Sequence, residues 1–421
     1  MKIKDIYLEN FRGFNHLHLP LNGESAVIVG ANGAGKSSVL NATVTLLSRI
    51  IDPISFGVSK KVQLNETDIK NGKQRYKIKA FFEYNGLEGS TEIIKSRSKT
   101  AQSKSLAFSK DDFKKIVEHI HGSIDENVPT NIPVSIFYSA HRNVIDVPLR
   151  IKNKHEFDQF STYLNCFSSG TDFRSFFEWF RNQEDLENEE KLDSDINYRD
   201  RQLEAVRKAV YGFMPGFSDL RIMRKGKMRM VISKNGHRLE LNQLSDGEKS
   251  TLAMIGDLAR RLALANPLLE KPLRGQGIVF IDEIELHLHP AWQREIIQRL
   301  ENVFPNIQFI ISTHSPQVLG EIQSAKVYLI SELMNENSFS AVQVDNTFGK
   351  DSNLILEEYM GASSKNELIK NKIEYLYKNI SINDLEKAKD LLAELSNIIG
   401  NTDPNLIKAE TIIKRKENLK K

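Results

Sequence analysis

The sequence lacks several features that would place it outside the ordinary globular class. Cys166 is the single cysteine among 421 residues, so the chain has no internal disulfide framework. The charges nearly cancel, with 58 Lys and Arg against 55 Asp and Glu, so net charge does not indicate a nucleic-acid binder. No stretch approaches about 18 uninterrupted apolar residues, and the charged N-terminus lacks the apolar core of a signal peptide. These absences predict a cytoplasmic protein with no membrane span, in which any basic surface is local.

What the chain does contain is an alternation of helical and extended patterns. Hydrophobic residues make up 40% and charged residues 27%, as in soluble globular proteins. Residues 244–266, 278–282, 291–303 and 307–311 have the patterns of helix, strand, helix and strand. Strands that are separated by helices pair in parallel in most folds. The sequence therefore predicts an α/β fold with a mixed, largely parallel sheet.

Shifts in composition divide the chain into four expected regions. We expect an N-terminal lobe of the fold over residues 1–150, an inserted helical subdomain over 151–215, a C-terminal lobe over 216–345 and a helical region over 346–421. Within the insertion, four phenylalanines between Phe173 and Phe180 follow helical spacing, which predicts a buried helix face.

Smaller signals concern turns and irregular stretches. Asn85-Gly86 and Asn235-Gly236 predict two-residue hairpin turns. Residues 97–131 are polar and predict no regular structure, and the basic residues 414–421 predict a solvated tail.

A glycine-rich segment carries the strongest chemical signal. It follows an apolar strand at residues 25–30, precedes a helix expected from Lys36 to about Ile50, and has the pattern G-x-x-x-x-G-K-S from Gly30 to Ser37. Glycines let successive amides face phosphates, Lys36 would pair with the β- and γ-phosphates, and Ser37 would bind Mg²⁺. The residues expected to bind ATP here are Asn32, Gly33, Ala34, Gly35, Lys36, Ser37 and Ser38.

Two carboxylates end the apolar strand at 278–281. A Mg²⁺-nucleotide needs one acid to hold the metal, which we assign to Asp282, and a second group to polarise the attacking water, which we assign to Glu283. His314 ends the next apolar strand, where it could contact the γ-phosphate or the water. Either pattern alone also fits a strand end with solvated polar residues. The phosphate loop, as we call the glycine-rich segment from Gly30 to Ser37, is what favours a catalytic role for both.

The segment Leu244-Ser-Asp-Gly-Glu248 opens a helix after a strand region. Ser245, the amide of Gly247 and the helix start would form a second anion-binding nest. Ser245 followed by Glu248 is also a capping box, and both roles are compatible.

Taken together, these motifs resemble the ABC-type ATPase heads of the SMC, RecF and overcoming-lysogenisation-defect group over residues 30–314. The resemblance implies that Ser245, Gly247 and Glu248 complete the ATP site of a second copy, in a head-to-tail homo-oligomer. It also implies a basic residue near the nucleotide at Arg12, and a D-loop at the dimer interface in Glu285-Leu-His-Leu-His-Pro290. The chain departs from the group where a glutamine usually follows the strand at 132–138, and His141 or Arg142 stands as a substitute.

Within that group, the chain is most similar to the Septu-type PtuA ATPases, some of which accompany retrons. The similarity lies in Phe173–Glu190 and in the region from Gly349 to Gly400, and no Toprim-type nuclease motif follows His314. It implies an anti-phage defence ATPase that regulates a separate HNH-type nuclease and has no nuclease activity of its own. The similarity also allows DNA, or a retron reverse transcriptase with its msDNA, as a further partner. The alternative is a RecF-like or SMC-like repair ATPase that binds DNA across dimerised heads.

Overall fold

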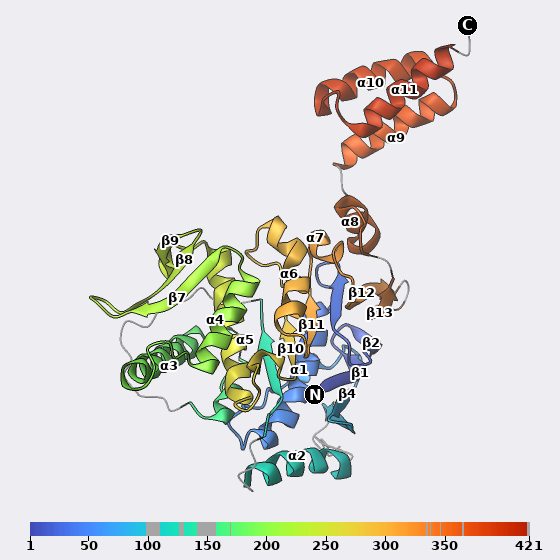
Figure 1. Ribbon diagram of the computed structural model, residues 1–421. Coiled ribbons are helices and arrows are strands. Elements are labelled where there is room, and N and C mark those ends of the chain that lie inside the picture. The colour runs from blue at the N-terminus through green and yellow to red at the C-terminus, as the bar shows by residue number, and fades with distance from the viewer. Residues whose placement is uncertain are drawn as a thin grey trace. The chain divides into compact units, whose positions relative to one another are not determined.

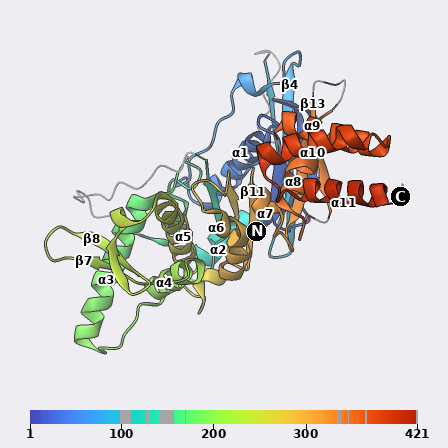
Figure 2. The same cartoon turned by 90° about the horizontal axis from the view of Figure 1, so that it is seen from above.

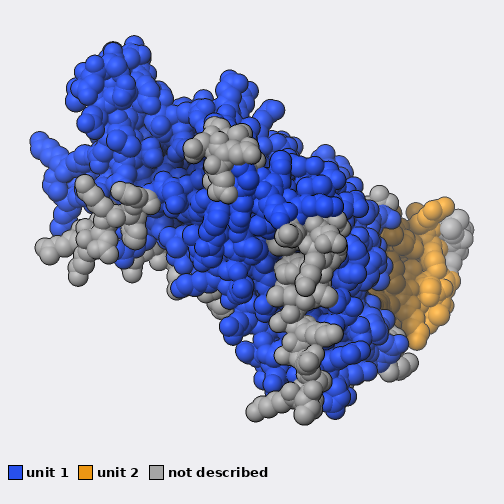
Figure 3. Space-filling view, turned by 90° about the horizontal axis from the view of Figure 1, so that it is seen from below, with its two compact units in different colours: residues 1–355 blue, residues 356–421 orange. Residues whose placement is uncertain are grey.

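The computed structural model describes the chain in two compact units. The first unit spans residues 1–355 and the second spans 356–421 (Figure 3). The described residues are 1–97, 110–125, 130–140, 157–168, 170–333, 336, 338–345, 347–363 and 366–418.

A six-stranded sheet forms the centre of the first unit (Figure 1). Its strand order is β13-β12-β3-β11-β10-β6, and all neighbours are parallel except β12 and β13. Strands β3, β6, β10 and β11 are short, largely apolar runs that are buried along their whole length, as expected for parallel strands covered on both faces. The predicted α/β class is therefore confirmed. The strands are β3 (Ala26–Gly30), β6 (Val134–Tyr138), β10 (Gly277–Ile281), β11 (Ile307–Ser312), β12 (Lys326–Leu333) and β13 (Ser338–Val344).

A second, antiparallel sheet has the order β2-β1-β4-β5. Side chains on β4 alternate between buried and partly exposed, because only one face of this sheet meets the core. Helix α1 (Lys36–Ile54) contacts strands of both sheets and buries apolar side chains between them. The strands are β1 (Lys2–Phe11), β2 (Phe14–Pro20), β4 (Arg75–Tyr84) and β5 (Leu87–Ser96).

Residues 173–240 add two helices and a small sheet to the first unit. Helix α3 (Phe173–Asp193) buries Phe173, Phe176, Phe177 and Phe180, which confirms the predicted core face. Helix α4 (Arg201–Phe213) packs on α3 and on the long helix α5 (Asp246–Ala265). The small antiparallel sheet consists of β7 (Phe217–Met223), β8 (Arg229–Lys234) and β9 (His237–Glu240), and Figure 2 shows it beside α3 and α4.

A buried charge network ties α5 to the end of β6. Asp257 accepts hydrogen bonds from Arg260 (2.7 Å), Arg261 (2.8 Å) and the hydroxyl of Tyr138 (3.0 Å). Burial opposes the charge of Asp257, but the guanidinium groups of Arg261 and Arg260 hold the pKa of its carboxyl below the ordinary value. Arg261 also donates to the carbonyls of Thr162 and Leu164. One helix thus fixes both the strand before residue 139 and the segment that follows the undescribed residues 141–156.

Three helices make up most of the second unit. Helices α9 (Glu367–Ser381), α10 (Leu385–Ile399) and α11 (Pro404–Asn418) enclose a small apolar core that includes Leu376, Leu395 and Ile413. Gly400 ends α10 with a φ of 84°, as its position in the sequence predicts. The remaining helices are α2 (Lys110–Asp125), α6 (Pro290–Val303), α7 (Pro316–Leu319) and α8 (Ser352–Met360).

Both predicted hairpin turns are confirmed, and two other expectations are wrong. Asn85-Gly86 and Asn235-Gly236 join paired antiparallel strands, and all four residues have positive φ. Residues 97–131 are not irregular throughout, since α2 lies within them. Residues 414–418 are not a free tail, because α11 continues through them and Lys416 donates to the carbonyl of Ile380 at 2.6 Å.

None of the described helices combines the length and the apolar character needed to cross a membrane.

Replacing Asp257 by Ala should destabilise the first unit strongly. The change leaves two buried guanidinium groups without their carboxylate, which costs about 3–5 kcal/mol in comparable sites. The free energy of unfolding in urea measures the effect. The control is Glu204→Ala, which removes an exposed i,i+4 pair with Lys208 on α4 and should cost below about 1 kcal/mol. Equal losses in the two variants would contradict the importance of the buried network.

Candidate functional site

Three adjacent strands deliver the predicted site residues to one edge of the central sheet. Parallel pairing places β3, β11 and β10 side by side with their carboxyl ends together. The glycine-rich loop follows β3, Asp282 and Glu283 follow β10, and Thr313 and His314 follow β11. The carboxyl edge of such a sheet is where α/β proteins bind ligands.

The loop after β3 has the backbone conformation that phosphate binding requires. Gly35 precedes the first residue of α1 with a φ of 99°, in the left-handed region that favours glycine, and no side chain caps the helix. The free amides of the first turn of α1 therefore point out of the helix toward the loop.

Lys36 is buried within this loop and only 5% exposed. Its ammonium donates to the carbonyls of Gly30 (3.0 Å) and Ala31 (2.9 Å). Burial lowers the pKa of Lys36, while the nearby carboxylates of Asp282 and Glu283 counteract the shift. A cation held in a desolvated position beside the loop fits the phosphates of a nucleotide.

Ser37 and Asp282 meet where a magnesium ion would be held. The hydroxyl of Ser37 donates to a carboxylate oxygen of Asp282 at 3.1 Å, and the hydroxyl of Ser312 donates to the same oxygen. One hydroxyl and one carboxylate are a donor set that suits Mg²⁺, since this ion keeps several waters and binds substrate phosphates as well. The two residues thus fit the predicted metal.

Glu283 begins a sharp turn directly after Asp282. Its φ is 50°, and its amide donates to the Ser312 hydroxyl at 2.9 Å. A left-handed φ in a residue other than glycine is uncommon and is maintained only by its surroundings. The two carboxylate-bearing residues are thus fixed to the end of β11 as well as to β10.

Glu285 links the carboxylate turn to His314. It accepts a hydrogen bond from the Thr313 hydroxyl at 2.8 Å and another from the His314 amide. Burial lowers the pKa of the His314 imidazole, and the ammonium of Lys36 lowers it further, against the opposing carboxylates. The imidazole is therefore mainly neutral near pH 7, so it can accept a proton or a hydrogen bond.

Arg12 lies next to the start of α1. It has a φ of 48° in the turn between β1 and β2, and it donates to Asp68 (2.9 Å) and to the Ser38 hydroxyl (3.1 Å). Its guanidinium therefore contacts Ser38, the residue that directly follows Ser37 in α1. Sequence reasoning placed Arg12 near the nucleotide only by resemblance, and the structure now gives it two contacts.

The segment from Ser245 to Glu248 forms a capping box at the start of α5. The amide of Glu248 donates to the Ser245 hydroxyl (3.3 Å), and the amide of Ser245 donates to the Glu248 carboxylate (3.0 Å). Burial opposes the charge of Glu248, but Lys234 on β8, at 2.6 Å, contributes to holding its pKa below the ordinary value. Within the described residues, no hydrogen bond or ion pair joins this segment to the phosphate loop.

Gly247 lies against the segment that follows Asp282 and Glu283. A Cβ atom at this position would lie 2.2 Å from the carbonyl oxygen of His287, so no larger residue fits without displacement. His287 itself has a φ of 64°. The start of α5 and the Glu285–Pro290 segment therefore form one continuous surface.

Sequence reasoning gave three polar residues no role at this edge of the sheet. Ser312 bonds to Asp282 and Glu283, Glu285 accepts a hydrogen bond from the His314 amide, and Thr313 donates to Glu285. Their signal was their position, because Ser312 and Thr313 end an apolar strand and Glu285 follows Glu283 by two residues. The substitutes expected for the missing glutamine, His141 and Arg142, lie outside the described residues.

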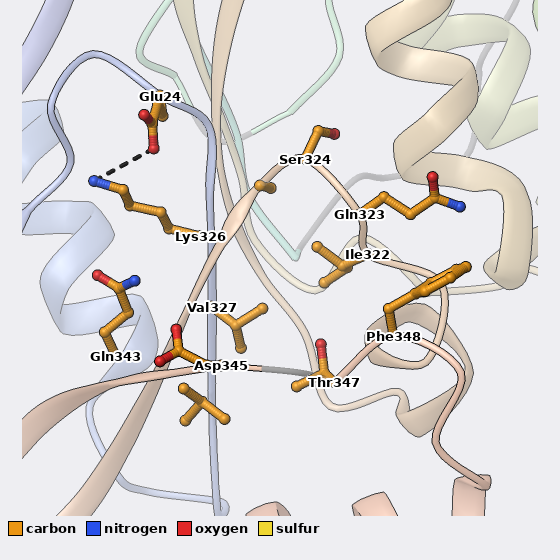
Figure 4. A pocket seen from close by; sticks show the side chains of 12 residues that line it. Glu24, Ile322, Gln323, Ser324, Lys326, Val327, Gln343, Asp345, Thr347 and Phe348 are labelled. Carbon is orange, nitrogen blue, oxygen red and sulfur yellow. Dashed lines mark ion pairs between the residues drawn. The ribbon is translucent and has the colours of Figure 1, made fainter.

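A pocket lies at the opposite edge of the sheet (Figure 4). It has a volume of about 530 Å³ and surrounds the ion pair between Glu24 and Lys326 (3.3 Å), at the points where β3 and β12 begin. Because the phosphate loop is at the other end of β3, this pocket does not belong to the site.

Comparison with known proteins adds relatives of the whole chain. A family model described as "AAA domain, putative AbiEii toxin, Type IV TA system" matches residues 25–320. The "Retron Ec83 probable ATPase" of Escherichia coli is 31% identical over 99% of this chain and 87% of its own. The "Retron Vc95 probable ATPase" of Vibrio cholerae serotype O1 biovar El Tor is 30% identical over 84% and 77%. The "Septu protein PtuA" of Bacillus thuringiensis is 23% identical over 75% and 72%.

Gly247→Ala should impair catalysis while leaving the phosphate loop intact. The added methyl group collides with the His287 carbonyl and shifts the start of α5 away from the Glu285–Pro290 segment. We expect ATP binding within about twofold of wild type and hydrolysis lowered at least about tenfold, because small displacements of catalytic groups cost that much or more.

The matched control is Gly212→Ala on α4. A Cβ atom there meets Val303 at 3.5 Å, an ordinary van der Waals distance. Wild-type hydrolysis in Gly247→Ala, or an equal loss in Gly212→Ala, would contradict the assignment.

Proposed function

Because the chain belongs to the family described as "AAA domain, putative AbiEii toxin, Type IV TA system" and is related to the retron and Septu ATPases, we propose that it is an ATP-hydrolysing subunit of an anti-phage defence complex. The observation that carries the proposal is the meeting of the phosphate loop, Asp282, Glu283 and His314 at one sheet edge.

Lys36 and the loop amides would hold the β- and γ-phosphates. The buried ammonium exchanges its two carbonyl partners for phosphate oxygens, and the amides at the start of α1 supply further donors. Ser37 and Asp282 would hold Mg²⁺, which neutralises phosphate charge when bound. Arg12 would stabilise the end of the loop through Ser38.

Glu283 would orient and polarise the attacking water. Its backbone is fixed by Ser312, so the carboxylate starts from a defined position beside the metal-holding Asp282. His314, mainly neutral and anchored by Glu285, would accept a hydrogen bond from the water or donate one to the γ-phosphate. The preorganised set supplies positioning and charge stabilisation, the two requirements of phosphoryl transfer.

The segment from Leu244 to Glu248, which we call the signature segment, would act on a second copy of the chain. Ser245, Gly247 and the start of α5 offer an anion-binding nest that, in the part of the chain the structure describes, forms no bond to its own loop. Its continuity with the Glu285–Pro290 segment couples that nest to the catalytic carboxylates of the same subunit. A head-to-tail dimer would therefore contain two composite ATP sites, and its conformation would respond to the nucleotide bound in each.

A separate effector would carry out the defensive reaction. We assign this role to an HNH-type nuclease, on the strength of the similarity to the Septu ATPases. ATP binding and hydrolysis would then control the shape of the assembly and, through it, the effector.

Two substitutions should separate nucleotide binding from hydrolysis. Lys36→Ala removes the buried cation of the loop, so we expect loss of ATP binding. Glu283→Gln keeps the side-chain shape but removes the base, so we expect binding to persist and hydrolysis to fall about 10²- to 10³-fold. Equilibrium binding of labelled ATP and phosphate release are the two measurements.

Light scattering after size exclusion then reports the dimer. Glu283→Gln with ATP and Mg²⁺ should shift to twice the monomer mass, and Lys36→Ala should not. The exposed Glu332→Gln serves as the control for Glu283 and should behave as wild type. Wild-type hydrolysis in Glu283→Gln would refute the role of that residue, and wild-type ATP affinity in Lys36→Ala would refute the whole site.

A further inference from the structure

The hairpin of β7 and β8 concentrates positive charge that the whole chain does not have. Between Phe217 and Lys234 the sequence contains six lysines and arginines against one acid, although the two classes nearly balance over the full length. The strands are joined by the exposed tip Arg224-Lys-Gly-Lys-Met228. The charge is therefore local, and it lies on a single projecting element.

The arginines of the hairpin are already engaged, whereas the lysines of the tip are not. Arg224 pairs with Glu184 (2.8 Å) and Asp185 on α3, and Arg229 pairs with Glu240 (2.7 Å). Lys225 and Lys227 are exposed and form no ion pair within the described part of the chain. The paired arginines hold the hairpin in place, and the two lysines remain available to an external anion.

The shape of the hairpin narrows the class of partner. Strand β9 pairs only with Val231–Lys234, so the outer part of the hairpin, from Met223 and Arg229 to the tip, is a two-stranded ribbon. Figures 1 and 2 both show this ribbon reaching the outer edge of the first unit. A two-stranded β-ribbon has the width that the major groove of duplex DNA admits.

The hairpin lacks what single-stranded nucleic acid requires. Proteins that bind single strands offer exposed aromatic rings on which bases stack. Phe217 is the one Phe, Tyr or Trp between residues 217 and 240, and it is buried at 5% exposure. Basic side chains without exposed aromatic rings favour binding to the phosphates of a duplex over binding to a single strand.

We propose that the tip of the β7–β8 hairpin binds the phosphate backbone of duplex DNA through Lys225 and Lys227. Arg224, fixed by Glu184 and Asp185, positions the tip. At the base of the same hairpin, Lys234 pairs with Glu248 of the signature segment, so the DNA-binding element adjoins the proposed ATP-binding surface. Binding at the tip does not depend on head dimerisation, and it can be tested in the absence of ATP.

The test is charge reversal at the tip, with the full chain and a labelled DNA duplex of about 30 base pairs, or three helical turns. Wild type should bind with an affinity that falls steeply as salt rises. The double variant Lys225→Glu/Lys227→Glu should bind at least about tenfold more weakly, and its log–log salt slope should be shallower by about 2, one phosphate contact per lysine. The neutral variant Lys225→Gln/Lys227→Gln should fall between the two.

The control places the same charge change on the second unit. Lys370 and Lys408 are exposed there and form no ion pair within the described residues, so Lys370→Glu/Lys408→Glu should leave affinity and slope unchanged. Circular dichroism and ATP binding at wild-type levels show that each variant is folded.

Three results would overturn the proposal. The first is no binding of the duplex by wild type, and the second is equal affinity in the tip and control variants. The third is preference for another polyanion: tighter binding of the corresponding single strand, or of poly-glutamate, would identify a single-stranded nucleic acid or an acidic protein instead. None of these results bears on ATP hydrolysis, so failure here is distinguishable from failure of the proposed function.

Discussion

Parallel pairing of β3, β11 and β10 is the constraint on which the rest of the structure depends. It alone brings residues 30–37, 282–283 and 313–314 to one edge, although they are separated by up to 284 positions in the chain. Each strand is fully buried and carries no polar side chain before its last residue, except Gln308 on β11. The chemistry is thus concentrated where the strands stop, because the sheet itself has no room for it.

At that edge, the charges hold one another in place before any ligand arrives. Lys36 lies among the carboxylates of Asp282, Glu283 and Glu285, and the lysine lowers the pKa of His314 in turn. Ser312 bonds to both the Asp282 side chain and the Glu283 amide, so β10 and β11 cannot shift independently. Incoming phosphates would replace interactions that already exist rather than order a loose site, which favours tight positioning over adaptability. On α5, by contrast, the Ser245–Glu248 segment lies against the Glu285–Pro290 segment, and among the described residues it forms no hydrogen bond or ion pair with the loop of its own chain.

Local patterns predicted much of the fold and the outline of the site. The two Asn-Gly turns, the Phe173–Phe180 face and the helix stop at Gly400 depend on nearest-neighbour backbone chemistry, and all are confirmed. Contacts made only in three dimensions were not predictable. The sequence of residues 414–418 predicts a solvated tail. In the structure these residues continue α11, because Ile413 of that helix packs with Leu376 and Leu395 of other helices. Ser312 and Glu285 gained their roles from strands that meet in space, and no spacing in the sequence encodes that meeting.

The central claim is that each ATP site is built from the loop of one subunit and the signature of another. Mixing two inactive variants tests it most directly. Lys36→Ala disables the loop, and Ser245→Asp keeps the cap of α5 but places a negative charge in the nest. If the sites are composite, equal amounts of the two proteins form mixed dimers with one intact site, and hydrolysis recovers to about a quarter of wild type. If loop and signature of one chain served the same site, the mixture would remain as inactive as either variant alone.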